Sequence, residues 1–315
     1  TGPLTKLGTG TLTLNGAHPW TGAFVVNGGA VAVPGQATGK ALIALGAAPG
    51  SVATMSVSGA NARLGSSEYL EVGSSGNGTL NVTDGAQVTS VTTTALAVNP
   101  GSSGEVNVTG NGSSLTTGTA LFVGLQGPAV MTVGSGGVAT VGQLRLGEQP
   151  GGSGAFVLAT GGTLNVGGAD GIRTGTGESG LYLNGGTLKV TGSSLTTTVP
   201  MILNNSTLID TSGVDGVFGG ALSGPGGFVK IGGGNLYLNT PGSYAGGTSL
   251  FGGSIVVPAA NALGTGPISV LGGSLQSTGT FSRDGAVTVD GAGHSLSAAS
   301  FMEIGVGGTG SLTVK

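Results

Sequence analysis

The sequence predicts an all-β protein, a parallel β-helix in which one coil stacks on the next. Three observations predict this fold. Short strand motifs return at a nearly constant step, apolar residues alternate with Thr, Ser or Asn inside each motif, and Gly-rich corners separate the motifs. Dividing the 315 residues by a repeat of about 25 residues gives a β-helix of about 12–13 coils.

The first strand motif has the form L-x-[VL]. Its leucines return at steps of 26, 25 and 23, in Leu70-Glu71-Val72, Leu96-Ala97-Val98, Leu121-Phe122-Val123 and Leu144-Arg145-Leu146. A second motif precedes several such strands at a constant offset of 15, as Met55-Ser56-Val57, Val106-Asn107-Val108 and Val287-Thr288-Val289. Alternation puts one face of each strand inside. The expected lining of the bore is Leu12, Leu14, Leu70, Val72, Leu96, Val98, Leu121, Val123, Leu144 and Leu146.

The short repeats are themselves part of a longer sequence repeat. Residues 2–33 match 226–257 at an offset of 224, which aligns Lys6 with Lys230 and Trp20 with Tyr244. Residues 69–82 match 301–314 at an offset of 232. We therefore expect one continuous solenoid over 1–315, with related repeats at 1–33 and 224–257 and regular coils over 52–168. Neither end has the polar cap that a solenoid needs, so we expect a fragment of a longer repetitive protein.

The composition narrows the class of function. The chain has 70 Gly, 7% charged and 38% hydrophobic residues, and no cysteine, so it should bury a core but cannot form disulfides or thiolate sites. A net charge of −3 gives no electrostatic case for nucleic acid or an anionic membrane. The longest apolar run, 41–48, is far shorter than a membrane helix, and residues 1–30 show no signal peptide.

The two long repeats, "LTKLGTGTLTLNG…WTG…VNGGAVAV" and "FVKIGGGNLYLN…YAGGTSLFGGSIVV", resemble the autotransporter-associated β-strand repeat, or passenger-associated transport repeat. They depart from its pattern at His18 and Gly242, where Asn is usual, and at Trp20 in place of Tyr. The resemblance implies a right-handed β-helical passenger domain, secreted across a Gram-negative outer membrane to the cell surface. It also implies a C-terminal translocating β-barrel domain, which is not in this chain. The family includes adhesins, self-aggregation factors, proteases and esterases, so it leaves the function open.

Sequence motifs for catalysis or ligand binding are weak. Gly175–Gly180 fits G-x-G-x-x-G without a strand–helix unit around it, and its "GESG" resembles a serine-protease motif. A triad needs a base, and the two histidines, His18 and His294, both lie in Gly-rich corners. The segment 35–41 lacks the spacing of a phosphate loop. The segment 167–173 is a single poor match to a calcium-binding turn, which needs successive copies.

A glycan-cleaving site needs paired carboxylates about 5–10 Å apart. The outward column expected from the L-x-[VL] motif, Glu71, Ala97, Phe122 and Arg145, does not place two acids on adjacent coils, and Glu303 belongs to the next long repeat. Thr runs at 92–94 and 196–198 suit exposed strands, either as structural filling or as a hydrogen-bonding adhesive face. Six Asn residues begin N-x-[ST], which is background in this composition: Asn77, Asn81, Asn107, Asn111, Asn204 and Asn205.

The sequence thus predicts a non-enzymatic surface protein without a catalytic, cofactor or metal site. It would act as a stalk, an adhesin or a self-associating surface in aggregation or biofilm, with partners among its own copies or host and cell-surface molecules. We expect neither nucleic acid nor a small-molecule substrate as a partner. Two alternatives stay open: a repeating segment of an extracellular filament, and the β-helix scaffold of a glycan-cleaving or hydrolytic enzyme whose site lies outside this chain.

Overall fold

The computed structural model describes residues 2–18, 21–258 and 260–315. The chain folds into two compact units. Unit 1 comprises Thr1–Leu164 and Arg173–Gly180, and unit 2 comprises Asn165–Ile172 and Leu181–Lys315. The single continuous solenoid expected from the sequence therefore stays a prediction, and each unit is described by itself.

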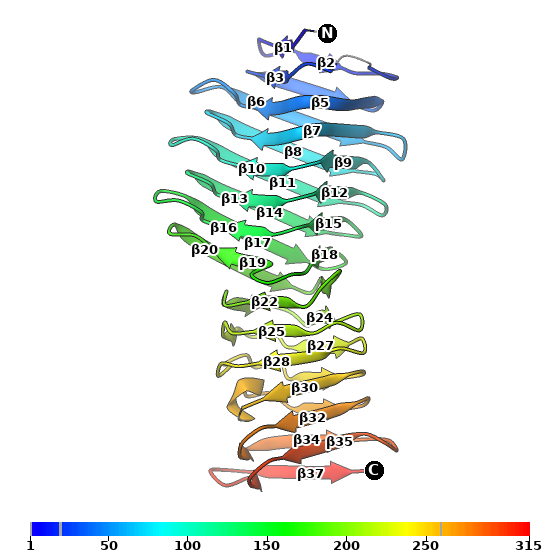
Figure 1. Cartoon of the computed structure of the whole chain (residues 1–315), viewed down its shortest axis with the longest axis vertical. Helices are drawn as coiled ribbons and strands as arrows, with labels where there is room; N and C mark the ends of the chain where they lie inside the picture. Colours follow the sequence, from blue (N-terminus) through cyan, green and yellow to red (C-terminus); the bar gives the residue numbers. More distant parts are fainter. Residues whose placement is uncertain (1, 19–20, 259) are drawn as a thin grey trace. The chain divides into compact units, whose positions relative to one another are not determined.

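Unit 1 is built from three stacks of short parallel strands (Figure 1). The first stack contains β2 (Thr11–Thr13), β4 (Gly29–Val33), β6 (Val52–Ser58), β8 (Asn77–Thr83), β11 (Ser103–Thr109), β14 (Pro128–Gly134) and β17 (Ser153–Ala159). The second contains β9 (Gln87–Ser90), β12 (Ser114–Thr117) and β15 (Val138–Val141). The third contains β1 (Leu4–Lys6), β3 (Phe24–Val26), β5 (Gln36–Leu45), β7 (Arg63–Val72), β10 (Thr93–Leu96), β13 (Ala120–Val123) and β16 (Leu144–Leu146).

Three strands contain residues of both units: β18 (Thr163–Val166), β19 (Ile172–Thr174) and β20 (Glu178–Asn184). Unit 2 has one stack made of β21 (Thr187–Val190), β24 (Thr207–Asp210), β27 (Phe228–Ile231), β29 (Thr248–Leu250), β31 (Ile268–Val270), β34 (Gly285–Val289) and β37 (Gly310–Val314). Another contains β22 (Leu195–Thr197), β25 (Gly216–Phe218), β28 (Asn235–Leu238), β30 (Ser254–Val257), β32 (Ser274–Ser277) and β35 (Ser295–Ala298). The remaining elements are β23 (Met201–Leu203), β26 (Leu222–Ser223), β33 (Phe281–Arg283), β36 (Met302–Ile304) and the 3-10 helix η1 (Ala260–Leu263).

The expected all-β, parallel β-helical fold of about 12–13 coils is confirmed, since the parallel sheets form about 13 solenoid turns. No helix in the described part of the chain is long and apolar enough to cross a membrane.

In the first stack of unit 1, successive inward side chains are direct strand partners and are fully buried: Met55, Leu80, Val106, Met131 and Phe156. Each turn therefore continues the apolar column of the previous turn, which is the main source of stability in such a fold.

The expected lining of the bore is correct at most positions. Eight of the ten residues are buried: Leu14, Leu70, Val72, Leu96, Leu121, Val123, Leu144 and Leu146. Leu12 is half-buried. Val98 is also half-buried, so the prediction that it lines the bore is wrong.

The error at Val98 comes from a shift in register. The strand partner of Leu70 and Leu121 is Thr94, and the partner of Val72 and Val123 is Leu96. Ala97 therefore follows the strand at the corner. It has φ +53°, and Gly73 and Gly124 occupy the same corner in the neighbouring turns with φ +75° and +78°. The outward residue in this turn is Ala95, not Ala97.

The long repeat is preserved in the strand register. Lys6 pairs with Val26 and Leu12 with Val31. At the offset of 224, Lys230 pairs with Leu250 and Leu236 with Ile255. Each copy therefore forms the same local pair of turns, and the lysine and its strand partner are separated by the same offset of 20 in both. Trp20, aligned with Tyr244, lies outside the described residues.

Candidate functional site

The glycine-rich segment Gly175–Gly180 comprises a corner of unit 1 and the first residues of β20. Its backbone N–H groups donate to carbonyl oxygens of the preceding corner: Gly175 to Leu146, Thr176 to Glu148, Gly177 to Gly147 and Glu178 to Gly152, over 2.8–3.2 Å. A phosphate-binding loop needs such N–H groups for its ligand. Here they hold two successive turns together.

The other two sequence motifs have similar structural uses. The segment 35–41 lies largely within β5, and the Lys40 ammonium group donates to the His18 carbonyl at 2.8 Å. In the segment 167–173, Asp170 has φ +54°, and its backbone N–H donates to Thr196 Oγ1 at 2.9 Å. Residues 2–18, 21–258 and 260–315 contain no group of three or more His, Asp or Glu that could hold a metal ion.

The two histidines and Ser179 show no catalytic arrangement in their described contacts. The carbonyl of His18 accepts the Lys40 ammonium group, and His294 Nδ1 hydrogen-bonds to the Asp290 carbonyl. Ser179 lies at the exposed start of β20. His18 and Ser179 belong to unit 1 and His294 to unit 2. The expectation that this chain has no catalytic centre stays a prediction.

The charged residues on the outward column of the third stack pair locally. Arg145 forms an ion pair with Glu148, through Nε to Oε2 at 2.8 Å among other contacts, and lies 4.7 Å from the Phe122 ring centre. Glu71 accepts a hydrogen bond from Ser74 at 2.6 Å. Glu303, in unit 2, is on β36 opposite Ser282. No two of these carboxylates come from adjacent turns.

The Thr and Asn residues mainly stabilise the turns. Thr94 is buried and shares a 2.7 Å hydrogen bond with Thr117, and Thr197, also buried, accepts from Val199 N–H. On the outer face of the first stack, Ser103 donates to Asn77 at 2.9 Å and Asn107 to Asn81 at 3.1 Å. These hydrogen-bonded pairs form polar ladders from one turn to the next.

Buried cations form a feature that the sequence analysis missed. Lys230 is fully buried, and its ammonium group donates to three backbone carbonyls at 2.9 Å, those of Ile231, Gly232 and Gly252. Lys6, which is half-buried, makes the equivalent contacts in the first repeat, to Leu7, Gly8 and Gly28 at 2.8–3.0 Å. The lysine thus joins its own corner to the corner of the following turn in both copies. We call these two groups the corner lysines.

Two further cations are used in the same way. Lys40 is fully buried and bonds to the His18 carbonyl. Arg283 is 7% exposed and donates to the carbonyls of Gly264, at 3.0 Å, and Gly266. A buried charge is costly unless hydrogen bonds compensate for the lost water. Backbone carbonyls supply such bonds here, although the Nε of Arg283 is buried without a hydrogen-bond partner. The sequence signal was present, since strand alternation puts Lys6 and Lys230 on the inward side.

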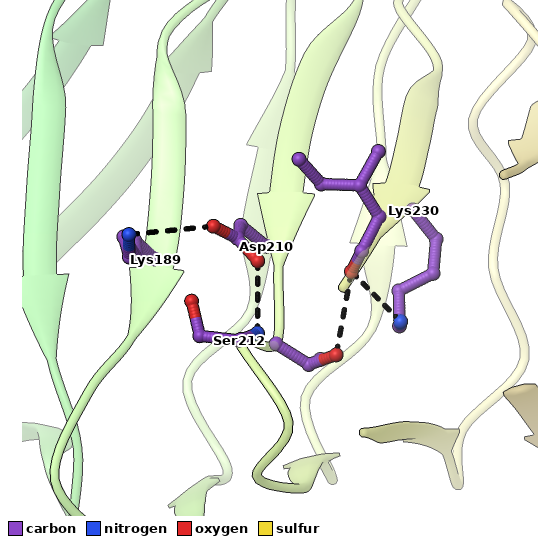
Figure 2. Close-up of polar contacts among 6 residues, drawn as sticks. Lys189, Asp210, Ser212 and Lys230 are labelled. Atoms are coloured by element: carbon purple, nitrogen blue, oxygen red, sulfur yellow. Dashed lines mark hydrogen bonds and ion pairs between the residues drawn. The ribbon is translucent and has the colours of Figure 1, made fainter. Parts of the chain in front are cut away.

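Burial shifts the pKa values of Lys230 and Tyr244. Burial lowers the pKa of Lys230 to about 8, and the negative charges of Asp210 and Asp215 oppose this shift. Figure 2 shows Asp210 on the strand beside Lys230, bonded to the Ser212 N–H at 2.8 Å and paired with the Lys189 ammonium group at 3.6 Å. Burial also raises the pKa of Tyr244, whose hydroxyl lies 2.5 Å from Thr248 Oγ1.

Unit 1 also has two adjoining hollows on its outer surface. One has a volume of about 550 Å³ and crosses the first residues of β8, β11, β14 and β17. The other, about 510 Å³, lies between 150–153 and 176–178, and both are lined by Ser153. We call the two hollows together the strand-start groove. Three of its lining residues, Thr176, Gly177 and Glu178, belong to the G-x-G-x-x-G segment of the sequence analysis. The other lining residues were not singled out as part of a ligand site from sequence.

The architecture defines the class of protein to which the chain belongs, the repetitive β-solenoids. Its polar groups chiefly form hydrogen bonds between its own turns. The passenger-associated transport repeat family model matches residues 4–33 and 228–257. These are the two segments that the sequence aligned, so the resemblance is confirmed, and the solenoid is consistent with an autotransporter passenger domain. No curated protein and no solved structure matches the chain.

Proposed function

We propose that this chain is a non-catalytic segment of a secreted, surface-exposed autotransporter passenger that acts as a stalk and as an adhesive or self-associating surface. The family matches at 4–33 and 228–257 support the passenger role and the extracellular location. Catalysis has no supporting cluster in the described residues: Lys230 and Arg283 bond to backbone carbonyls, and Arg145 pairs with the single local carboxylate of Glu148.

One observation carries the adhesive role. The outer faces of unit 1 repeat small polar groups from turn to turn, for example Thr89, Thr116 and Thr140 as partners in the second stack. Each neutral hydrogen bond contributes about 0.5–1.5 kcal/mol, so such a face binds only through many repeated contacts. An extended solenoid surface provides them.

The test uses the full chain coupled to inert beads. We expect the beads to cluster with one another or to adhere to cells, in comparison with beads that carry an unrelated soluble protein. The same preparation should leave ester, peptide and uronate substrates unchanged. Beads that stay dispersed and do not adhere would contradict the adhesive role. Turnover that disappears on substitution of one Ser, His or acidic residue would contradict the non-catalytic role.

A further inference from the structure

The strand-start groove has the dimensions of a ligand site. Its two parts, about 550 Å³ and 510 Å³, fall within the usual range of small-ligand pockets, roughly 300–1,000 Å³. The groove crosses successive turns, because its lining residues are strand partners: Asn77 with Ser103, and Pro128 with Ser153. A ligand lying in it would meet one turn after another.

The backbone itself shapes the groove. Gly104 and Gly154, the second residues of β11 and β17, pack against the preceding corner, where an added Cβ would lie 2.4 Å from the Val72 carbonyl oxygen and 1.9 Å from that of Val123. The outward neighbours of these glycines line the groove. Because close backbone packing fixes the hollow, it does not depend on movable side chains.

The lining alternates polar and apolar groups. Asn77, Thr79, Ser103 and Ser153 supply amide and hydroxyl groups, and a central section supplies apolar surface from Pro128, Ala129, Val130 and Ala155. Ser103 donates to Asn77 Oδ1 at 2.9 Å. Val130 is 43% exposed. A ligand with both hydroxyl groups and apolar C–H faces fits this lining.

The charge of the groove selects among such ligands. Its lining contains two carboxylates, Glu105 and Glu178, and no Lys, Arg or His. Glu105 accepts one hydrogen bond from Asn107, and both acidic residues are exposed. An anionic polymer would be repelled, whereas protonated amino groups would be attracted.

The spacing of the turns points to a polymer of rings. Stacked parallel strands lie about 4.8 Å apart, which is close to the length of one pyranose unit in a linear glycan. An extended peptide advances about 3.3–3.4 Å per residue and does not keep this step. We propose that the strand-start groove binds a linear hexose or hexosamine glycan without carboxylate or sulfate groups, and prefers one with free amino groups. This inference rests on the proposed non-catalytic binding function.

The first experiment compares three probes by isothermal calorimetry on the full chain: a glucosamine oligomer, a cello-oligosaccharide of equal length and an oligogalacturonate of equal length. We expect the strongest binding for the glucosamine oligomer, weaker binding for the neutral oligomer, and at least about tenfold weaker binding for the uronate. Equal binding of the uronate, or no binding of the glucosamine oligomer, overturns the proposal.

The second experiment locates the site. Ala155→Phe fills the groove at an outward position of β17, and Ala159→Phe puts the same ring at an outward position of the same strand away from the groove. We expect Ala155→Phe to weaken glucosamine binding about tenfold or more and Ala159→Phe to leave it within about twofold. Equal effects of the two variants overturn the assignment of the site.

A charge variant covers the case in which the groove-filling variant does not fold. The double variant Glu105→Gln and Glu178→Gln keeps the shape of the groove, and it should abolish the preference for the glucosamine oligomer over the neutral one. Glu71→Gln, on the third stack, is the matched control and should keep that preference; loss of the preference in the control, or its survival in the double variant, overturns the charge argument. If the chain binds no glycan while coated beads still cluster or adhere, the groove inference fails and the proposed function stands.

Discussion

Lys230 and Lys6 show how single residues explain a repeated sequence pattern. Each corner lysine projects inward from its strand and binds carbonyls of two successive corners. The glycine pairs that follow, Gly28-Gly29 and Gly252-Gly253, form the second of these corners. A Cβ on Gly29 or Gly253 would lie 2.6 Å or less from a backbone oxygen. The lysine and the glycine pair therefore belong to one structural unit, which accounts for their joint recurrence at an offset of 224.

The first prediction concerns the contribution of a corner lysine to stability. We expect Lys230→Met to lower the free energy of unfolding by about 2–3 kcal/mol. Hydrogen bonds to charged groups contribute about 1.5–3 kcal/mol each, and three carbonyls would lose their donor, but the cost of burying the ammonium group offsets part of that sum. Lys189→Met removes a partly exposed pair with Asp210 at 3.6 Å and should cost less than about 1 kcal/mol. Urea titration followed by circular dichroism measures both. A Lys230→Met protein as stable as the wild type would show that the cost of burying the charge outweighs its bonds.

The second prediction concerns pH. The pKa of Lys230 is about 8 in the folded chain, against 10.5 for an ordinary lysine. Between these values the unfolded chain holds a proton that the folded chain has released, so stability should rise with pH from about 8 to 10. Above about pH 10 the raised pKa of buried Tyr244 acts in the opposite sense, because only the unfolded chain ionises its tyrosine, and stability should fall.

Urea midpoints measured from pH 7 to 11 test this prediction. In Lys230→Met the rise should shrink to the part contributed by Lys40, whose pKa burial also lowers. In Tyr244→Phe the fall above pH 10 should become smaller. A rise of unchanged size in Lys230→Met would mean that another group titrates.

At the scale of elements, the alternation of apolar residues predicted the strands and most of the core, but not every register. The alternation pattern gave the wrong register for the turn at 93–98, because a threonine occupies an inward position there. Thr94 is buried against Thr117 by a mutual hydrogen bond, which a pattern based on apolar residues cannot detect. Ala97 then completed a false L-x-V motif while occupying a corner at positive φ, where glycine is usual.

The candidate site was less predictable than the strands. Once the strands are placed, the alternation of inward and outward residues gives the inward position of the corner lysines. The corner lysines could therefore have been predicted from the sequence. The strand-start groove was not, because it depends on how closely Gly104 and Gly154 approach neighbouring corners. Those distances connect residues more than one full turn apart in the chain and arise only when the turns stack.

The third prediction tests the corner glycines. Gly73 has φ +75°, and an added Cβ would lie 1.9 Å from the Ser103 carbonyl oxygen. Gly101 has φ +80° but open space around its Cβ position. Gly101→Ala should therefore cost only the backbone strain, about 1–2 kcal/mol, whereas Gly73→Ala should cost more than about 3 kcal/mol or prevent folding. Thermal or urea unfolding measures the stability of both variants. Similar losses of stability in the two variants would refute the steric argument.

At the scale of the whole molecule, the turns of unit 1 after its first repeat are longer than most turns of unit 2. From Met55 onward, partners in the first stack of unit 1 pair at sequence offsets of 25 or 26. In unit 2 the offsets are shorter, between 19 and 21 from Leu188 to Val287. The strand-start groove lies on the longer turns. In a solenoid each turn interacts chiefly with its neighbours, so substitutions in one unit should leave the local structure of the other unit intact.

The fourth prediction concerns association between copies or with a cell surface. We expect it to depend little on salt, because screening acts only on charges that carry the contact, and the chain is only 7% charged. Three of the charged side chains on the outer faces are already paired within the chain: Glu71 bonds to Ser74, Arg145 to Glu148 and Lys189 to Asp210. Small polar groups on the outer faces would then supply most of the contact.

Light scattering and bead adhesion measured from low to about molar salt give the test, with the wild-type chain beside Glu71→Gln and Arg145→Gln. Association that changes little with salt, and equally little in both variants, is the outcome that repeated neutral contacts require. Suppose instead that association falls steeply with salt and that one of the variants removes this dependence. That residue would then leave its partner within the chain to meet another molecule, and the outer faces would act through a few charged anchors rather than through stacked hydroxyl and amide groups.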